Sequence, residues 1–240
     1  MLKTPITVFL MAVMACLSEQ SAYCQIGSVL KIIAKVVPEK EIARLAPLAK
    51  TPGRLGKEVG KLKLPELARA DLFLQVAVRN AILDSGEEVA IRKMGDVKGL
   101  ASLLSKINSS NVNQARGHLK ELQIGTAGQI RGGTVIAFGT KFGDGIKKGD
   151  TDLDILMKMN GKQFAIESKA YQSEIGTDII RADLHSLKHF CSEVAKDSTP
   201  IFCFDKPPSE LVQRVLQSEN VAFLIGTGEE ICTKLTFLAR

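Results

Sequence analysis

"TDLDILMKMNGKQFAIESKAY", residues 151–171, contains two short apolar runs that each carry charged side chains. Asn160-Gly161 separates the runs, and such a pair is the strongest short-range signal for a two-residue β-hairpin turn. Charged groups inside apolar runs cost free energy unless a partner compensates them. The stretch therefore predicts a hairpin of two strands whose charged side chains meet.

Alternation along the two strands predicts which charged side chains meet. Successive side chains point to opposite faces of a strand, so Asp152, Asp154 and Leu156 share one side of the first strand. Glu167 and Lys169 share one side of the second strand, and the tight turn brings both near Asp154. Two carboxylates offer hard oxygen ligands that suit Mg²⁺ or Mn²⁺. A lysine beside them can orient a water molecule or offset charge on a phosphoryl oxygen.

The segments on both sides of the hairpin predict an α/β fold with a mixed central sheet flanked by helices. A helix over 111–125 has Asn111 as its N-cap and Gly125 as its end. With the hairpin included, the predicted order of elements is α-β-β-β-α-β-α-β. The remaining predicted elements are strands at 134–140, 200–205 and 221–226 and helices at 177–196 and 208–219.

The hairpin and the order of elements over 111–226 resemble the PD-(D/E)xK nuclease superfamily. Its members carry an aspartate on one strand of a hairpin and Glu-x-Lys on the next strand. Here Asp154 matches the aspartate, and Glu167-Ser168-Lys169 matches Glu-x-Lys. Glu121 stands where many members carry an acidic residue in the preceding helix. Gln172 resembles a polar position of some branches.

This resemblance implies a restriction-endonuclease-like core, α-β-β-β-α-β, and a metal-dependent nuclease activity. Asp154 and Glu167 would hold Mg²⁺ or Mn²⁺, and Lys169 would position the attacking water. Glu121, with Asp152 as a further candidate, would support the site. The implied substrate is nucleic acid, with DNA favoured over RNA.

Two observations leave this interpretation open. The proline that often precedes the family's aspartate is absent, and Asp150 and Asp152 compete with Asp154 for its role. The alternation also fits an exposed hairpin face on which aspartates and lysines pair across the strands. Against an exposed face, the apolar run 164–166 makes the second strand apolar on both sides, as in a central strand.

A glycine-rich loop over 139–149 supplies candidate contacts to nucleic-acid phosphates. Lys141, Lys147 and Lys148 lie in this loop next to the hairpin, and Gln172 follows the hairpin. Side chains of these types position a nucleic acid through its backbone. A turn with solvated lysines is the equally favoured alternative.

Residues 25–107 are predicted to form a basic helical region in front of the nuclease-like domain, 108–240. Residues 25–70 carry ten basic and four acidic side chains, which accounts for the whole net charge of +6. Such a segment could meet an anionic membrane, nucleic acid or an acidic partner, or serve as a solvated linker. Helices are predicted at 65–86, ending at Gly86, and at 96–107.

Residues 1–24 are predicted to be a signal peptide. Lys3 precedes an apolar run over 5–17, which is short for a membrane span and suits the central part of an export signal. The protein is therefore expected to be secreted or periplasmic. Lipoprotein processing at Cys16 and an uncleaved helix are the alternatives.

Export together with nuclease chemistry is typical of a toxin or effector, which implies an immunity or inhibitor protein as a partner. Two other classes remain open. A nuclease fold without catalysis could bind nucleic acid or protein. A membrane-active envelope protein would instead depend on its basic front segment.

Overall fold

The computed structural model describes residues 39–45, 47, 58, 66–79, 82–107, 111–145, 149–171 and 174–240. The predicted signal peptide with Cys16 lies outside these ranges, as do Lys147, Lys148 and Gln172. No helix within the ranges combines the length and the apolar character that crossing a membrane requires.

Five strands form one mixed sheet in the order β1-β2-β3-β4-β5. The first three strands pair antiparallel, and β3, β4 and β5 pair parallel. This confirms the predicted α/β architecture with a mixed central sheet flanked by helices. The bounds are β1 (Thr134–Phe142), β2 (Thr151–Met159), β3 (Lys162–Lys169), β4 (Ser198–Phe204) and β5 (Ala222–Ile225).

The turn between β2 and β3 is the predicted two-residue hairpin. Asn160 has φ 47° and Gly161 has φ 85°, and both angles lie in the left-handed region. A tight hairpin of this kind needs positive φ at both central residues, which Asn and Gly adopt at low cost. The turn fixes the register, so that Leu156 faces Ala165 and Ile155 faces Ile166.

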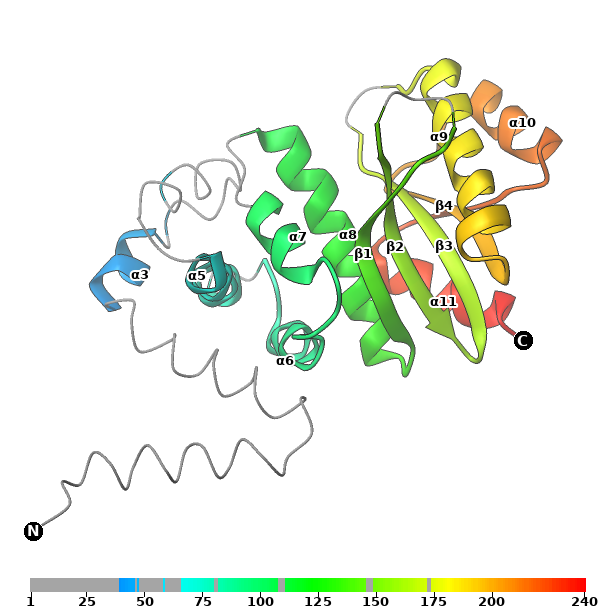
Figure 1. Cartoon of the computed structure of the whole chain (residues 1–240). Coiled ribbons are helices and arrows are strands. Elements are labelled where there is room, and N and C mark those ends of the chain that lie inside the picture. Colours follow the sequence, from blue (N-terminus) through cyan, green and yellow to red (C-terminus); the bar gives the residue numbers. More distant parts are fainter. Residues whose placement is uncertain are drawn as a thin grey trace, which may run out of the picture.

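Helices cover both faces of the sheet (Figure 1). One hydrophobic cluster lies between the sheet and the pair α8 and α11, and a second lies between the sheet and the pair α9 and α10. A short π-helical turn, η2, follows α9. The bounds are α8 (Val112–Ile130), α9 (Thr177–His189), η2 (Phe190–Val194), α10 (Glu210–Ser218) and α11 (Gly228–Leu238).

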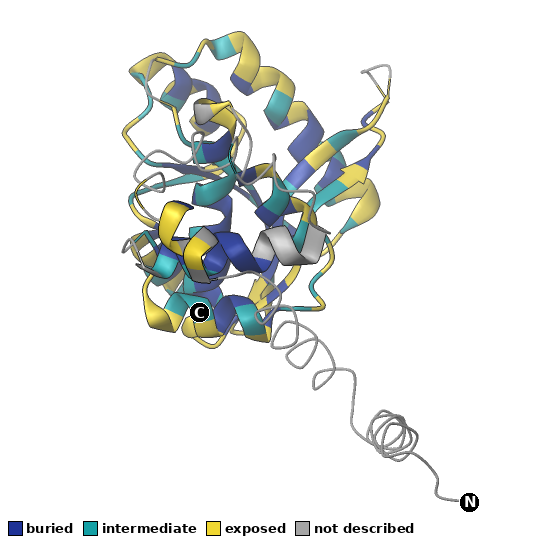
Figure 2. Ribbon diagram, turned by 90° about the vertical axis from the view of Figure 1, so that its left-hand side faces the viewer, coloured by how far each residue is buried: buried dark blue, intermediate teal, exposed yellow. Residues whose placement is uncertain are grey.

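Of the front helices, α6 and α7 pack onto α8, α5 packs onto α6 and α7, and α3 packs onto α5. All four share the hydrophobic cluster of α8, and Figure 2, viewed from the side of these helices, shows buried residues among the exposed ones. Leu45, Leu72 and Leu103 belong to the same cluster as Ile155 of the sheet. The core therefore crosses the boundary predicted between residues 107 and 108. The bounds are α3 (Glu39–Leu45), α5 (Glu66–Arg79), α6 (Ser85–Lys93) and α7 (Leu100–Ile107).

The helix predicted over 65–86 is two helices, so Gly86 is not a helix end. The Asp84 side chain accepts from the Glu87 N–H at 2.7 Å, and the Asp84 N–H donates to Glu87 Oε2 at 2.8 Å. This reciprocal capping box starts α6. The final helix α11 was also not predicted, although Thr227 and Glu230 form a second capping box at its start.

Gly125 does not end α8, which continues to Ile130. A Cβ atom at Gly125 would lie 2.5 Å from the ring of Phe138 in β1. The glycine therefore lets the helix approach the sheet closely. The predicted cap at the other end is confirmed, since the Asn111 side chain accepts from the N–H groups of Asn113 and Gln114.

Replacing Gly125 by alanine should destabilise the protein by about 1–3 kcal/mol, because the methyl group overpacks the contact with Phe138. Gly117 is the matched control, since it lies in the same helix and nothing approaches its added Cβ within 4 Å. Gly117→Ala should raise stability by up to about 1 kcal/mol through helix propensity. Urea unfolding measures both variants, and changes of the same sign would contradict the close packing.

Candidate functional site

β2 and β3 stop pairing beside the predicted carboxylates. The last antiparallel pair is Ile155 opposite Ile166. Beyond it, the Ser168 N–H donates to Asp154 Oδ2 at 2.7 Å. A side-chain carboxylate thus takes the place of a backbone carbonyl as the acceptor. This bond ties the two strand ends together and holds the Asp154 side chain in place.

The alternation predicted for the first strand does not continue through Asp154. Leu153 and Leu156 pack in the same hydrophobic cluster, whereas Ile155 packs in the other. The side-chain alternation is therefore interrupted between Leu153 and Ile155, where β2 no longer pairs with β3. The expectation that Asp152, Asp154 and Leu156 share one regular face is therefore wrong.

Lys169 lies buried between two carboxylates. Its side chain is 9% exposed, and Nζ lies 2.6 Å from Glu167 Oε1 and 2.8 Å from Asp183 Oδ2. Glu167 precedes it by two positions on β3, and Asp183 comes from α9. The hairpin therefore brings the predicted lysine and glutamate together. The alternative of a solvated lysine on an exposed hairpin face is wrong.

The charges in this cluster shift one another's pKa values. Burial, and then the negative charges of Glu167 and Glu121, raise the pKa of Asp154 well above its ordinary value. Burial also raises the pKa of Glu167 to about 7, although Lys169 acts in the opposite direction. Burial lowers the pKa of Lys169, but the surrounding carboxylates outweigh it and the net pKa is raised. The lysine stays charged, while Asp154 and Glu167 resist full ionisation.

The raised pKa of Glu167 predicts a stability that falls with rising pH in the absence of metal. Folded Glu167 holds its proton up to about pH 7, whereas the unfolded chain releases it near 4.5. Unfolding free energy should therefore decrease between these values, by at most about 3 kcal/mol. Urea unfolding in EDTA from pH 4.5 to 8 measures this slope.

Glu167→Gln should flatten that slope, because the amide does not titrate. Glu210→Gln is the control, since Glu210 is an exposed carboxylate on α10. A Glu167→Gln protein with the slope of the wild type would show that another group causes the pH dependence.

Glu121 lies on α8, next to the carboxylates at the end of the hairpin. It is buried, its Oε1 lies 2.9 Å from His118 Nδ1, and its charge acts on Asp154. Sequence reasoning missed His118. The available signal was that His118 precedes Glu121 by three positions, because residues at this spacing are neighbours on one face of a helix.

Asp152 and Lys141 lie outside the buried cluster. The Asp152 side chain is 51% exposed, and its Oδ2 lies 3.9 Å from Lys106 Nζ. Lys141 is an exposed residue of β1 directly opposite Asp152. Between the competing aspartates, the structure therefore places Asp154 beside Glu167 and Asp152 at the surface. Lys141 belongs to a strand and not to the predicted loop.

The described part of the chain holds no group of three or more His, Cys, Asp or Glu side chains placed to bind a metal ion. Asp154 and Glu167 offer two carboxylates, and the contacts to Ser168 and Lys169 each use one of their oxygens. Mg²⁺ binds through one or two carboxylates and keeps several waters. The donor set fits such an ion, and a cation would offset the negative charge that helps to raise the pKa of Asp154.

Asp183 is the second site residue that sequence reasoning missed. It lies on α9 among Ile180, Leu184 and Leu187, which are buried against the sheet. A carboxylate beside an apolar helix stripe was the available signal. The same helix anchors the loop after β1, because Ser186 Oγ donates to buried Asp144 Oδ2 at 2.8 Å.

Comparisons with known proteins identify no family for this chain. No protein-family model matches it, and no curated protein matches it. Among solved structures, protein VC1899 from Vibrio cholerae is similar, with a TM-score of 0.43 and 12% sequence identity. The match covers 91% of this chain and 57% of VC1899, so the chain spans less than two thirds of that protein.

Proposed function

We propose that the protein is a Mg²⁺- or Mn²⁺-dependent nuclease that hydrolyses phosphodiester bonds in DNA. The observation that carries this proposal is the buried ion pair of Lys169 with Glu167 beside the fixed carboxylate of Asp154. These are the three groups that the resemblance to PD-(D/E)xK nucleases implies. The order of elements over 111–226 supports a restriction-endonuclease-like core.

Each residue has a role that follows from its position. Asp154 and Glu167 would hold the metal ion, which when bound polarises the phosphate and lowers the pKa of a bound water. The Lys169 ammonium lies where it can orient the attacking water and offset charge on the phosphoryl oxygen. Glu121 limits the ionisation of Asp154 through its own charge. Asp183 holds Lys169 in position through its contact from α9.

The second candidate is a catalytically inactive fold that binds nucleic acid or protein. One observation favours it. Two carboxylates already hold the Lys169 ammonium, so a structural role of the lysine in joining β3 to α9 accounts for its contacts.

Incubation of the purified protein with supercoiled plasmid separates the two candidates. Cleavage is expected with Mg²⁺ or Mn²⁺ and no cleavage in EDTA, because the carboxylates alone do not activate water. A protein that binds the plasmid but never cuts it with either metal would favour the inactive fold. Oligonucleotides of DNA and RNA with the same sequence then define the preferred polymer.

A further inference from the structure

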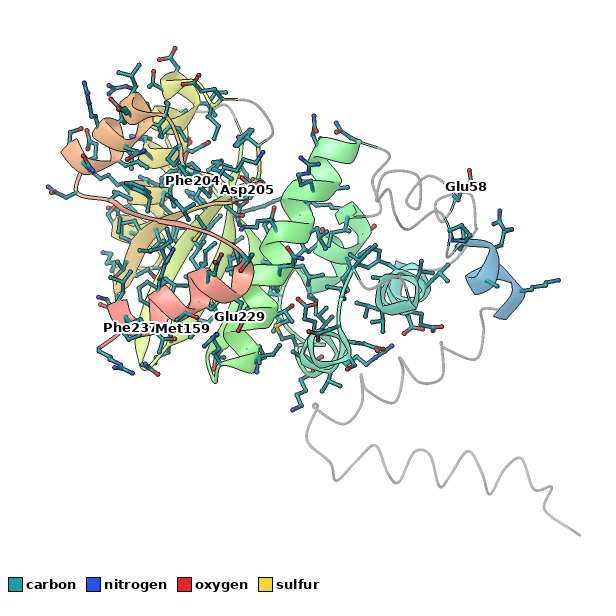
Figure 3. The ribbon with its side chains drawn as sticks, turned by 180° about the vertical axis from the view of Figure 1, so that it is seen from behind. Glu58, Met159, Phe204, Asp205, Glu229 and Phe237 are labelled. Carbon is teal, nitrogen blue, oxygen red and sulfur yellow. The ribbon has the colours of Figure 1, made fainter. Side chains whose placement is uncertain are left out.

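A cavity of about 310 Å³ adjoins Lys169 at the carboxyl ends of the parallel strands β3 and β4. Lys169 forms one wall, and Phe204 at the end of β4 forms another. Phe204 and Asp205 are labelled at this end of the sheet in Figure 3, and Met159 marks the opposite end beside the hairpin turn. The cavity therefore opens next to the proposed catalytic cluster.

The cavity has the apolar and aromatic surfaces that a nucleobase requires. Phe204 and Val212 line it and are buried, and Tyr171 lines it and is 36% exposed. Bases of single strands stack on aromatic side chains of this kind. The volume lies at the lower end of the range for small-molecule pockets. It suits a single base and excludes a duplex.

Polar groups surround this apolar surface. Lys206 is exposed at the edge and offers a positive charge to a phosphate. Glu174 is exposed and offers carboxylate oxygens to base amino groups. The Ser209 side chain makes no capping hydrogen bond to α10, so this hydroxyl is not committed to the helix.

We propose that this cavity binds the base of one nucleotide next to the scissile phosphate, so that the preferred substrate is single-stranded DNA. This inference rests on the proposed function, because it uses Lys169 as the reacting end of the site. The base stacks on Tyr171 above Phe204, and the adjoining phosphate meets Lys169. Lys206 contacts the phosphate on the other side of the same nucleotide.

A duplex reaches this arrangement only by unstacking a base. Flipping a base out of a duplex costs a few kcal/mol, and a single strand avoids most of that cost. Single strands and frayed ends should therefore bind more tightly than a blunt duplex of the same sequence.

Fluorescence anisotropy of a labelled 12-nucleotide DNA strand, in EDTA, tests the cavity without any cleavage. The full-length wild type should bind the single strand more tightly than the duplex. Tyr171→Ala should weaken single-strand binding by about tenfold, whereas Tyr171→Phe should keep it, because the stacking ring remains. Phe237→Ala is the matched control, since Phe237 is an aromatic side chain of α11 with 62% exposure outside the cavity.

The outcomes separate this inference from the nuclease proposal. Equal binding of both DNA forms, or Tyr171→Ala binding like the wild type, would overturn the base-binding cavity even if the protein cuts DNA. A wild type that never cuts DNA but shows the expected binding pattern would retain the cavity and reject the nuclease. Faster cutting of the single strand, lost in Tyr171→Ala but not in Phe237→Ala, would support both.

Discussion

Lys169→Met is expected to lower the rate of DNA cleavage by at least about 100-fold, the usual scale for a positioned electrostatic or proton-transfer group. The ammonium lies 2.6 Å from Glu167, one of the two proposed metal ligands, so its loss removes positive charge where the proposed mechanism places the phosphate. Metal should still bind, because Asp154 and Glu167 remain. Plasmid cleavage with Mg²⁺ or Mn²⁺, together with Mn²⁺ titration of the same variant, measures both effects.

The control for this variant is Lys158→Met. Lys158 is an exposed lysine of β2 in the same hairpin. The Lys158→Met substitution removes the same positive charge outside the buried cluster, so this variant should cleave DNA at the wild-type rate. If Lys169→Met cleaves at the wild-type rate, the lysine has no catalytic role and serves only to join β3 to α9.

The same substitution should also destabilise the fold, which must be measured before activities are compared. Breaking a buried ion pair by removing one partner typically costs about 3–5 kcal/mol. Here Glu167 and Asp183 would face each other without a counter-charge. Adding Glu167→Gln should recover part of the loss, because only one of the two buried carboxylates is then left without its lysine partner. Thermal unfolding of the two single variants and the double variant measures the coupling free energy between Lys169 and Glu167.

Asp154→Asn is expected to lower cleavage by at least about 100-fold and to weaken Mn²⁺ binding. Stability should change little or increase, because the variant removes one of several like charges while an amide oxygen can still accept from Ser168. Asp152→Asn is the matched control on the same strand, since its side chain is 51% exposed and lies near Lys106. It should have a much smaller effect on cleavage.

Cleavage assays and metal titrations of the two aspartate variants should therefore differ sharply. The reverse ranking would assign the metal to Asp152. Equal losses would mean that both aspartates take part, and that the hairpin end changes shape when the metal binds.

Local signals predicted the hairpin and the strands well. Asn160-Gly161 dictates its own turn, and the apolar runs around it fix which residues pair. The contact between Lys169 and Glu167 followed from a spacing of two on one strand. These features depend on residues close together in the sequence, so the sequence alone was sufficient to predict them.

The features that the sequence did not predict depend on packing between segments that are distant in the sequence. Gly125 has the local signature of a helix end, but its contact with Phe138 lets α8 run on to Ile130. Asp183 meets Lys169 only because α9 lies against β3. No rule of local propensity contains that contact, since it depends on the relative position of two elements.

The hydrophobic cluster that contains both Leu45 and Leu235 joins segments far apart in the sequence, and it therefore affects the order in which the protein folds. During synthesis the front helices emerge first, while β3 pairs in parallel with β4 only after α9 has been made. Helix α11, which follows β5, adds to the cover of α8. Long-range contacts of this kind form late and slow the folding of a chain. A nascent chain therefore cannot bring Asp183 against Lys169, or complete the sheet around β3, before α9 and β4 have been synthesised, and the cluster proposed as catalytic assembles only after that point.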